Sequence, residues 1–128
     1  MAITSLEGTK SSKDKKLLSA ASTVRGAAFR DQGMPDSAEQ EGLQAIALND
    51  TSPHAYNLLG ALAYARHEFE EGDEYFAEAE RRGSVGGDRR DIEGVLEAMA
   101  FLDRQALAAH LLGKDRQKYN WVHKYMKP

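Results

Sequence analysis

Four histidines are the side chains of this sequence best suited to proton transfer or metal binding: His54, His67, His110 and His123. They share no spacing typical of a metal site, and no motif for an activated nucleophile accompanies them. The chain has no cysteine, which excludes disulfides, zinc ribbons and thiol catalysis. We therefore expect no enzymatic activity, no bound metal and no cofactor.

A second place for chemistry is the loop at residues 83–90, where glycines precede an expected helix and arginines lie on both sides. Backbone N–H groups in such a loop can bind an anion, but the lysine and hydroxyl of a phosphate-binding loop are missing. A flexible turn between two helical segments explains the glycines more simply. Anion or nucleotide binding is therefore kept as a third hypothesis.

The composition limits what the chain can bind and where it works. A formal net charge of −3 and a pI near 5.8 argue against nucleic acid, whose partners usually carry a basic excess. No run of roughly eighteen apolar residues is present, and the lysine-rich N-terminus is the reverse of a secretory signal. We expect no membrane association and a cytoplasmic location. Ordinary apolar and charged content predicts one folded domain at residues 13–128, behind a flexible tail at residues 1–12.

The segments that must position any site have the patterns of helices. Glycine and proline clusters at 33–35, 50–53 and 83–87 separate stretches of helix length. After Pro53, the residues Tyr56, Leu59, Gly60 and Ala63 fall on one helical stripe. Strand-like alternation is absent, so the sequence predicts an all-α fold.

A period of 34 residues runs through these helices. Gly26, Gly60 and Gly94 are spaced 34 apart, each inside an expected helix where glycine costs about 1 kcal/mol. Close approach of two helices is the natural cause, so we expect all three glycines to pack against a neighbouring helix. The same shift relates further sets: Val24, Leu58 and Ile92; Ala28, Leu62 and Leu96; Ala45 and Ala79.

The middle period resembles the tetratricopeptide repeat (TPR) family, whose 34-residue unit is two antiparallel helices. Six residues match the aromatic, leucine, glycine, small, aromatic and alanine positions of the family pattern: Tyr56, Leu59, Gly60, Gly72, Phe76 and Ala79. The resemblance implies about three stacked hairpins in a right-handed superhelix, at about residues 19–52, 53–86 and 87–114. His110 replaces the second-helix aromatic of the third copy, so we expect an interior histidine with its polar atoms satisfied.

Residues 115–127 are predicted to form a helix that covers the end of the stack. Asp115 can cap this helix, and apolar residues follow at helical spacing, with three aromatic residues that would do the covering: Tyr119, Trp121 and Tyr125. An alternative is that this aromatic end packs against another copy of the chain and builds an oligomer.

In proteins that resemble this family, a peptide or partner helix lies across the first helix of each hairpin. The corresponding stripe predicts a groove lined by six residues: Arg30, His54, Asn57, Ala61, Tyr64 and Asp91. Arg30 could engage a carboxylate, and Asn57 offers both a donor and an acceptor. The other interpretation is that Tyr64 packs between repeats and that Arg30 is a solvated surface charge.

The resemblance therefore implies a non-enzymatic interaction module, an adaptor, scaffold or chaperone-like protein that binds a short peptide or helix of another protein. We expect a monomer or a weak homo-oligomer. The alternative is a structural protein that works by assembling with its own copies.

Overall fold

The computed structural model describes residues 11–84 and 87–128, and these residues contain helices and turns but no strand. This confirms the predicted all-α class. Of the predicted tail, residues 1–10 lie outside the described residues, whereas Ser11 caps the first described helix by accepting a hydrogen bond from the Asp14 backbone N–H at 3.1 Å. The elements are α2 (Ser12–Asp31), α3 (Pro35–Leu48), α4 (His54–Ala65), α5 (Phe69–Arg81), α6 (Gly87–Ala98), α7 (Phe101–Lys114) and the 3₁₀ helix η1 (Asn120–Met126).

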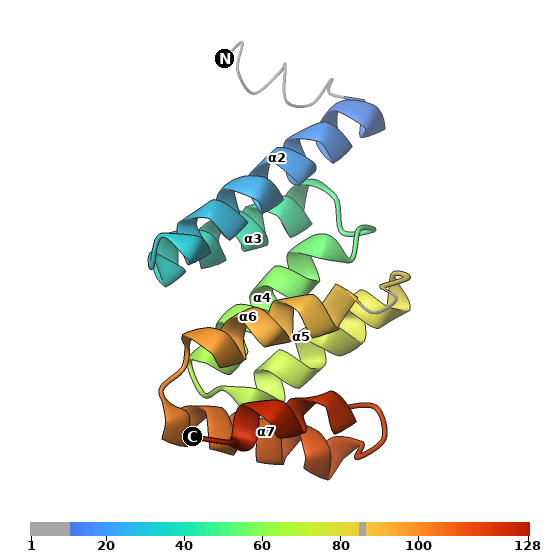
Figure 1. Cartoon of the computed structure of the whole chain (residues 1–128). Helices are drawn as coiled ribbons and strands as arrows, with labels where there is room; N and C mark the ends of the chain where they lie inside the picture. Colours follow the sequence, from blue (N-terminus) through green and yellow to red (C-terminus); the bar gives the residue numbers. More distant parts are fainter. Residues whose placement is uncertain (1–10, 85–86) are drawn as a thin grey trace.

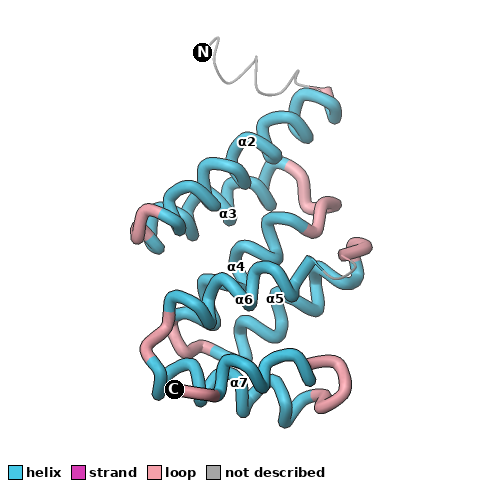
Figure 2. The backbone as a smooth tube through the Cα atoms, viewed as in Figure 1, coloured by secondary structure: helices cyan, strands magenta, loops and turns pink. Residues whose placement is uncertain are grey.

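The helices are arranged as a stack of antiparallel neighbours (Figure 1). Helices α2 and α3 pack side by side along their lengths, and so do α4 and α5. The third pair is more open, because α6 lies mainly against α4 while α7 packs mainly against η1 (Figure 2). The first two pairs are therefore close hairpins, whereas the third pair is loosely packed.

Three of the helices end in the same kind of turn. Gly33, His67 and Gly83 have positive φ angles of 74°, 65° and 91°. After each of them, a backbone N–H returns to a carbonyl five residues earlier in the chain, as in Met34 to Phe29 at 2.8 Å and Glu68 to Ala63 at 2.9 Å. Glycine adopts the left-handed conformation at two of these turns, whereas His67 adopts it without the freedom of glycine.

Two of the three periodic glycines lie where helices touch. A Cβ on Gly26 would lie 2.6 Å from the Leu58 side chain, and one on Gly60 would lie 2.7 Å from the Phe76 ring. Gly94 differs from the prediction, since it is exposed and a Cβ there would meet no atom within 4 Å. The reason is that no helix of the described residues covers this side of α6. The other residues predicted to pack repeats together are buried: Leu59, Phe76 and Ala79.

The C-terminal segment is shorter and more tightly wound than the predicted helix at 115–127. Asp115 accepts hydrogen bonds from the backbone N–H groups of Gln117 and Lys118 at 3.2 and 3.0 Å, and so holds a turn. The 3₁₀ helix η1 begins only at Asn120. Its three-residue period explains the correction, because residues 119, 122 and 125 then share one face.

Candidate functional site

A groove of about 720 Å³ opens between α2, α4 and α6. The end of α2 and the turn after it form one wall, α6 and the turn before α7 form the other, and the second half of α4 forms the floor. Residues from all these elements line it: Arg30, Asp31, Gly33, Pro35, Ala61, Leu62, Ala65, His67, Arg90, Asp91, Gly94, Val95, Ala98, Met99, Ala100 and Asp103. In a helical stack this is the side formed by the first helix of each hairpin.

The floor of the groove is apolar and made of small side chains. Ala61, Leu62 and Val95 are buried at its base, while Ala98 is exposed at its mouth. The missing side chain of Gly94 adds open space beside them. Such a surface can accept an apolar side chain of a ligand with little rearrangement.

The rim of the groove carries charges of both signs. The Arg30 guanidinium lies 3.6 Å from the Asp91 carboxylate and 3.4 Å from that of Asp31. On the other side, His67 Nε2 lies 3.4 Å from Asp103, and Arg90 is exposed. The ion pairs of this rim are long and partly solvated, so each contributes little to the free energy of folding. A charged group of a ligand can therefore replace one of them at a small cost in free energy.

His67 is the one residue of the rim that holds a strained backbone. A left-handed conformation costs an ordinary residue roughly 1–2 kcal/mol, and such strain gathers at functional sites. Its ring stacks on Phe69, with 5.5 Å between centroids and 22° between planes. The period of 34 places His67 where the first hairpin has Gly33, and this comparison is the signal in the sequence that could have pointed to it.

Three of the six predicted groove residues lie in this groove, and three do not. Arg30 and Asp91 face each other across it, and Ala61 lies in its floor. His54 is exposed at the other end of α4, where it lines a separate hollow of about 190 Å³ with Thr23. The groove residues that the prediction missed include four polar or apolar residues on and after α4 and α6: His67, Arg90, Met99 and Asp103.

Asn57 and Tyr64 are corrections to the predicted groove, because both are buried and neither lines it. Asn57 is 6% exposed, and its side-chain N–H donates to Ser84 Oγ at 3.2 Å. Tyr64 is 0% exposed. All residues of α4 from 55 to 64 are buried, including those that form the floor of the groove. A stripe counted on α4 therefore cannot identify an open face.

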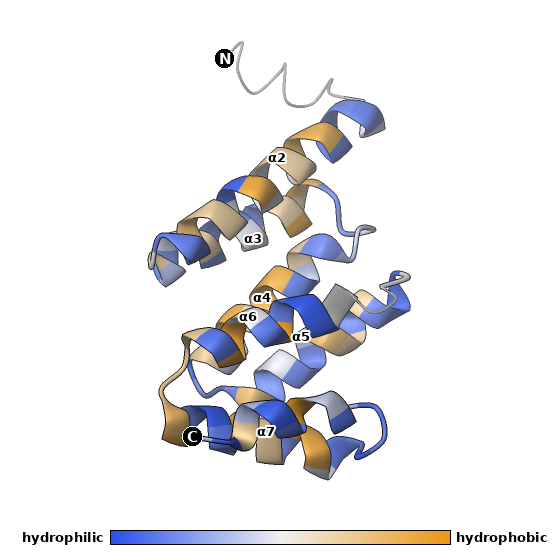
Figure 3. Ribbon diagram, in the orientation of Figure 1, coloured by the Kyte–Doolittle hydropathy of each residue, from blue (hydrophilic) through white to orange (hydrophobic). Residues whose placement is uncertain are grey.

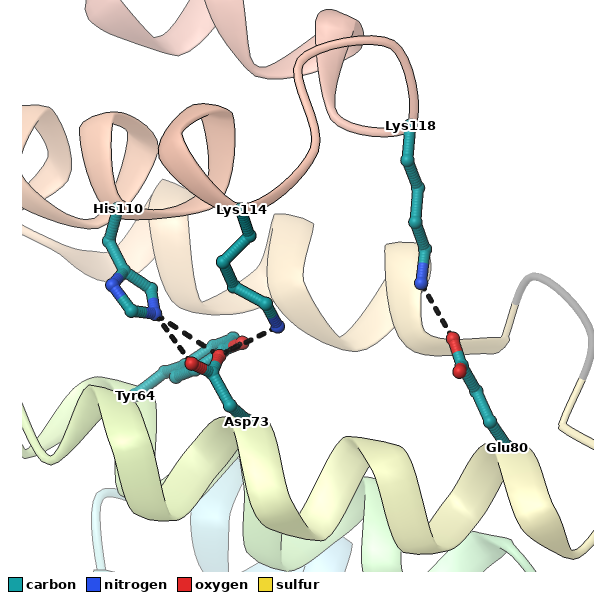
Figure 4. A network of polar contacts seen from close by, with 6 residues as sticks. All are labelled: Tyr64, Asp73, Glu80, His110, Lys114 and Lys118. Carbon is teal, nitrogen blue, oxygen red and sulfur yellow. Dashed lines mark hydrogen bonds and ion pairs between the residues drawn. The ribbon is translucent and has the colours of Figure 1, made fainter.

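Tyr64 belongs to a polar network that ties α5 to α7 (Figure 4). Its hydroxyl donates to Asp73 at 2.6 Å. The same carboxylate contacts His110 Nε2 at 2.9 Å and Lys114 Nζ at 2.9 Å. His110 is partly buried and has a polar partner, which agrees with the interior histidine expected from the sequence. A neighbouring pair, Lys118 and Glu80 at 2.6 Å, also joins the C-terminal turn to α5 (Figure 4).

This network predicts a loss of stability in acid. Partial burial raises the pKa of Asp73, but hydrogen bonds from Tyr64 and Lys114 outweigh it, so its pKa is lowered in the folded state. A carboxylate with a lowered pKa stabilises the fold above its unfolded pKa, about 4, and that contribution disappears as the pH falls through the folded value. Urea titrations between pH 7 and pH 3 are expected to show a smaller acid loss for Asp73→Asn than for the wild type. Equal pH dependence in the two proteins would contradict the prediction.

The loop at 83–90 lies partly outside the described residues, at 85–86. Of its flanking arginines, Arg81 and Arg82 both contact Glu78, and Arg89 lies 3.3 Å from Glu93. These arginines therefore have carboxylate partners within the chain.

The C-terminal aromatic residues pack against their own chain. Tyr119 is 3% exposed, and Trp121 lies under the Arg89 guanidinium at 4.9 Å from the ring centroid. The Tyr125 hydroxyl donates to Glu93 at 2.7 Å. Burial, together with that carboxylate, raises the pKa of Tyr125 to about 12. These contacts cover the end of the stack at α6 and α7.

None of the described helices combines the length and apolar character needed to cross a membrane. Within the same residues, no three carboxylate or imidazole side chains gather closely enough to hold a metal ion. No protein-family model matches the chain, and no curated protein or solved structure matches it either.

Proposed function

We propose that this chain is a TPR-like interaction module that holds a short segment of a partner protein in the groove between α2, α4 and α6. The observation that carries the proposal is the groove itself, with its apolar floor and two-signed rim. The 34-residue period and the two regular hairpins support the TPR-like arrangement. An adaptor or chaperone-like role without catalysis is the function that suits these features best.

The lining favours an amphipathic ligand. Alanines and Gly94 leave room for one or two apolar side chains, and Arg30 and Arg90 offer charge-assisted hydrogen bonds to a carboxylate beside them. A single helix or a short extended peptide covers a groove of this size. We expect a dissociation constant in the micromolar range, which corresponds to a binding free energy of about −8 kcal/mol.

A leucine at Gly94 is expected to block this site without disturbing the fold. The new side chain would grow into open space in the groove. Gly113 provides a matched control, since it is also an exposed helical glycine with no atom within 4 Å of a Cβ, but it lies outside the groove. Short peptides selected from a random display library on the wild type should lose at least about tenfold in affinity for Gly94→Leu, or about 1.4 kcal/mol. They should bind Gly113→Leu normally.

The readout is isothermal titration of the selected peptides against the three proteins. Peptides that bind all three equally would place the binding surface elsewhere and would overturn the groove proposal. Failure to select any peptide would overturn it as well.

A further inference from the structure

Helix α2 carries an apolar stripe on the side opposite its buried residues Ser19, Ser22 and Gly26, and two residues of this stripe, Ala20 and Val24, also border the small hollow beside His54. Leu17 and Val24 are 62% and 69% exposed, and Ala20 and Ala28 are exposed between and beyond them. With Ala21, these residues fall at i, i+3, i+4, i+7 and i+11, which is one side of a helix. Figure 3 shows apolar stretches along α2 at this end of the stack.

The internal period identifies this stripe as a stacking surface. A shift of 34 residues takes Ala21, Val24 and Ala28 to Ala55, Leu58 and Leu62, each of which is 3% exposed. In α4 these residues pack on the preceding hairpin, where Leu58 meets Gly26 and Gly42. A further shift reaches Ile92 and Leu96 of α6, both 0% exposed. The stripe is thus buried in the second and third hairpins, and in the first hairpin no described residue covers it.

We propose that a second copy of this chain covers the stripe, with the two α2 helices packed antiparallel about a two-fold axis. In the second and third hairpins this stripe packs against another amphipathic helix. Helix α2 is itself amphipathic, so the stripe of one copy can pack against the same stripe of a second copy. The opposite end of the stack is closed by η1, where Tyr119 and Val122 are buried. Among the described residues of that end, Leu102 is the one large hydrophobic side chain left exposed, so head-to-tail stacking has no matching apolar stripe there.

The charges at the two ends of the stripe fix the direction of pairing. Lys13 precedes Leu17 by one helical turn, and Asp31 follows Ala28 at the other end. The two lie in line with the stripe, one beyond each end, because eighteen residues complete five turns of a helix. Antiparallel pairing puts Lys13 of each copy beside Asp31 of the other, whereas parallel pairing puts like charges together. The Asp31 side chain is 72% exposed and accessible for this contact.

The test measures the mass of the full chain in solution by sedimentation equilibrium over a range of concentrations. We expect a dimer for the wild type and a monomer for Val24→Glu, which places two carboxylates in the centre of the interface. Leu102→Glu is the matched control, because Leu102 is also an exposed aliphatic residue, 78% against 69% for Val24, but lies on α7 at the far end of the stack. Circular dichroism confirms that each variant is folded, as expected for changes at exposed positions.

Charge exchange tests the antiparallel register. Lys13→Asp and Asp31→Lys should each weaken the dimer by at least tenfold, and the double exchange should restore it. A wild type that stays monomeric would overturn the proposal and assign the stripe to another occupant, either residues 1–10 or a different protein. A dimer that survives Val24→Glu, or that the double exchange does not restore, would overturn it too. The groove-blocking Gly94→Leu variant should remain dimeric, so failure of the groove proposal and failure of this one are distinguishable.

Discussion

Replacement of Tyr64 by alanine is expected to lower the free energy of unfolding by about 3–5 kcal/mol, the range for removing a buried aromatic side chain. Tyr64 is fully buried, with its ring centroid 5.1 Å from that of Phe76 and 6.1 Å from that of Phe69. Its hydroxyl is one of the donors to Asp73. Alanine would leave a cavity between α4, α5 and α7 and would weaken the network that holds α7 in place. A loss of this size is a large part of the stability of a small domain.

Chemical denaturation followed by circular dichroism measures this loss of stability. Two further variants separate the contribution of the hydrogen bond from that of the ring and provide a control. Tyr64→Phe keeps the ring and removes only the hydrogen bond to Asp73, which should cost about 1–3 kcal/mol. His54→Ala, at an exposed residue of the same helix, should change stability by less than about 0.5 kcal/mol. A Tyr64→Ala protein as stable as the wild type would show that the side chain is not part of the core. If Tyr64→Ala also lost partner binding, that loss would not be evidence for the groove, because the variant is less stably folded.

The all-α class and the places of the turns could be predicted from the sequence because they depend on local patterns, although α2 begins at Ser12 and not near residue 19. Glycine and proline interrupt the chain where the turns occur, and the stripe of Tyr56, Leu59 and Ala63 is helical in spacing. The period of 34 correctly indicated that Gly26 and Gly60 lie at helix contacts. The C-terminal segment was predicted less well, because α and 3₁₀ helices share the i, i+3 spacing that Tyr119, Val122 and Tyr125 display.

The groove could be predicted only in part, since it depends on which faces the other helices leave open. Arg30 and Asp91 were found because they lie at the edges of the stack, where a repeat register still gives the exposed side. The same register failed for Asn57 and Tyr64, because their side chains are buried against neighbouring residues and do not line the groove. Gly94 looked like its two periodic relatives, and only the open packing of α6 distinguishes it. No pattern along one helix contains that information.

Gly72→Ala is expected to destabilise the protein by a net amount of about 1–2 kcal/mol. A Cβ at this position would overlap the Tyr64 ring and lie 3.1 Å from the Gly60 carbonyl oxygen. The ring cannot move aside easily, because it is fully buried and held by its hydrogen bond to Asp73. Overpacking of this kind costs about 1–3 kcal/mol, and the better helix propensity of alanine offsets up to about 1 kcal/mol of it.

The matched comparison for Gly72→Ala is Gly94→Ala, which should have the opposite sign. Both glycines lie inside helices, so the gain in helix propensity is similar, but nothing lies within 4 Å of a Cβ at Gly94. Gly94→Ala is therefore expected to stabilise the protein by up to about 1 kcal/mol. Urea midpoints of the two variants measure the difference directly. If both substitutions stabilised the protein, Tyr64 would have to be free to move away from Gly72, and the first prediction for Tyr64→Ala would lose its basis as well.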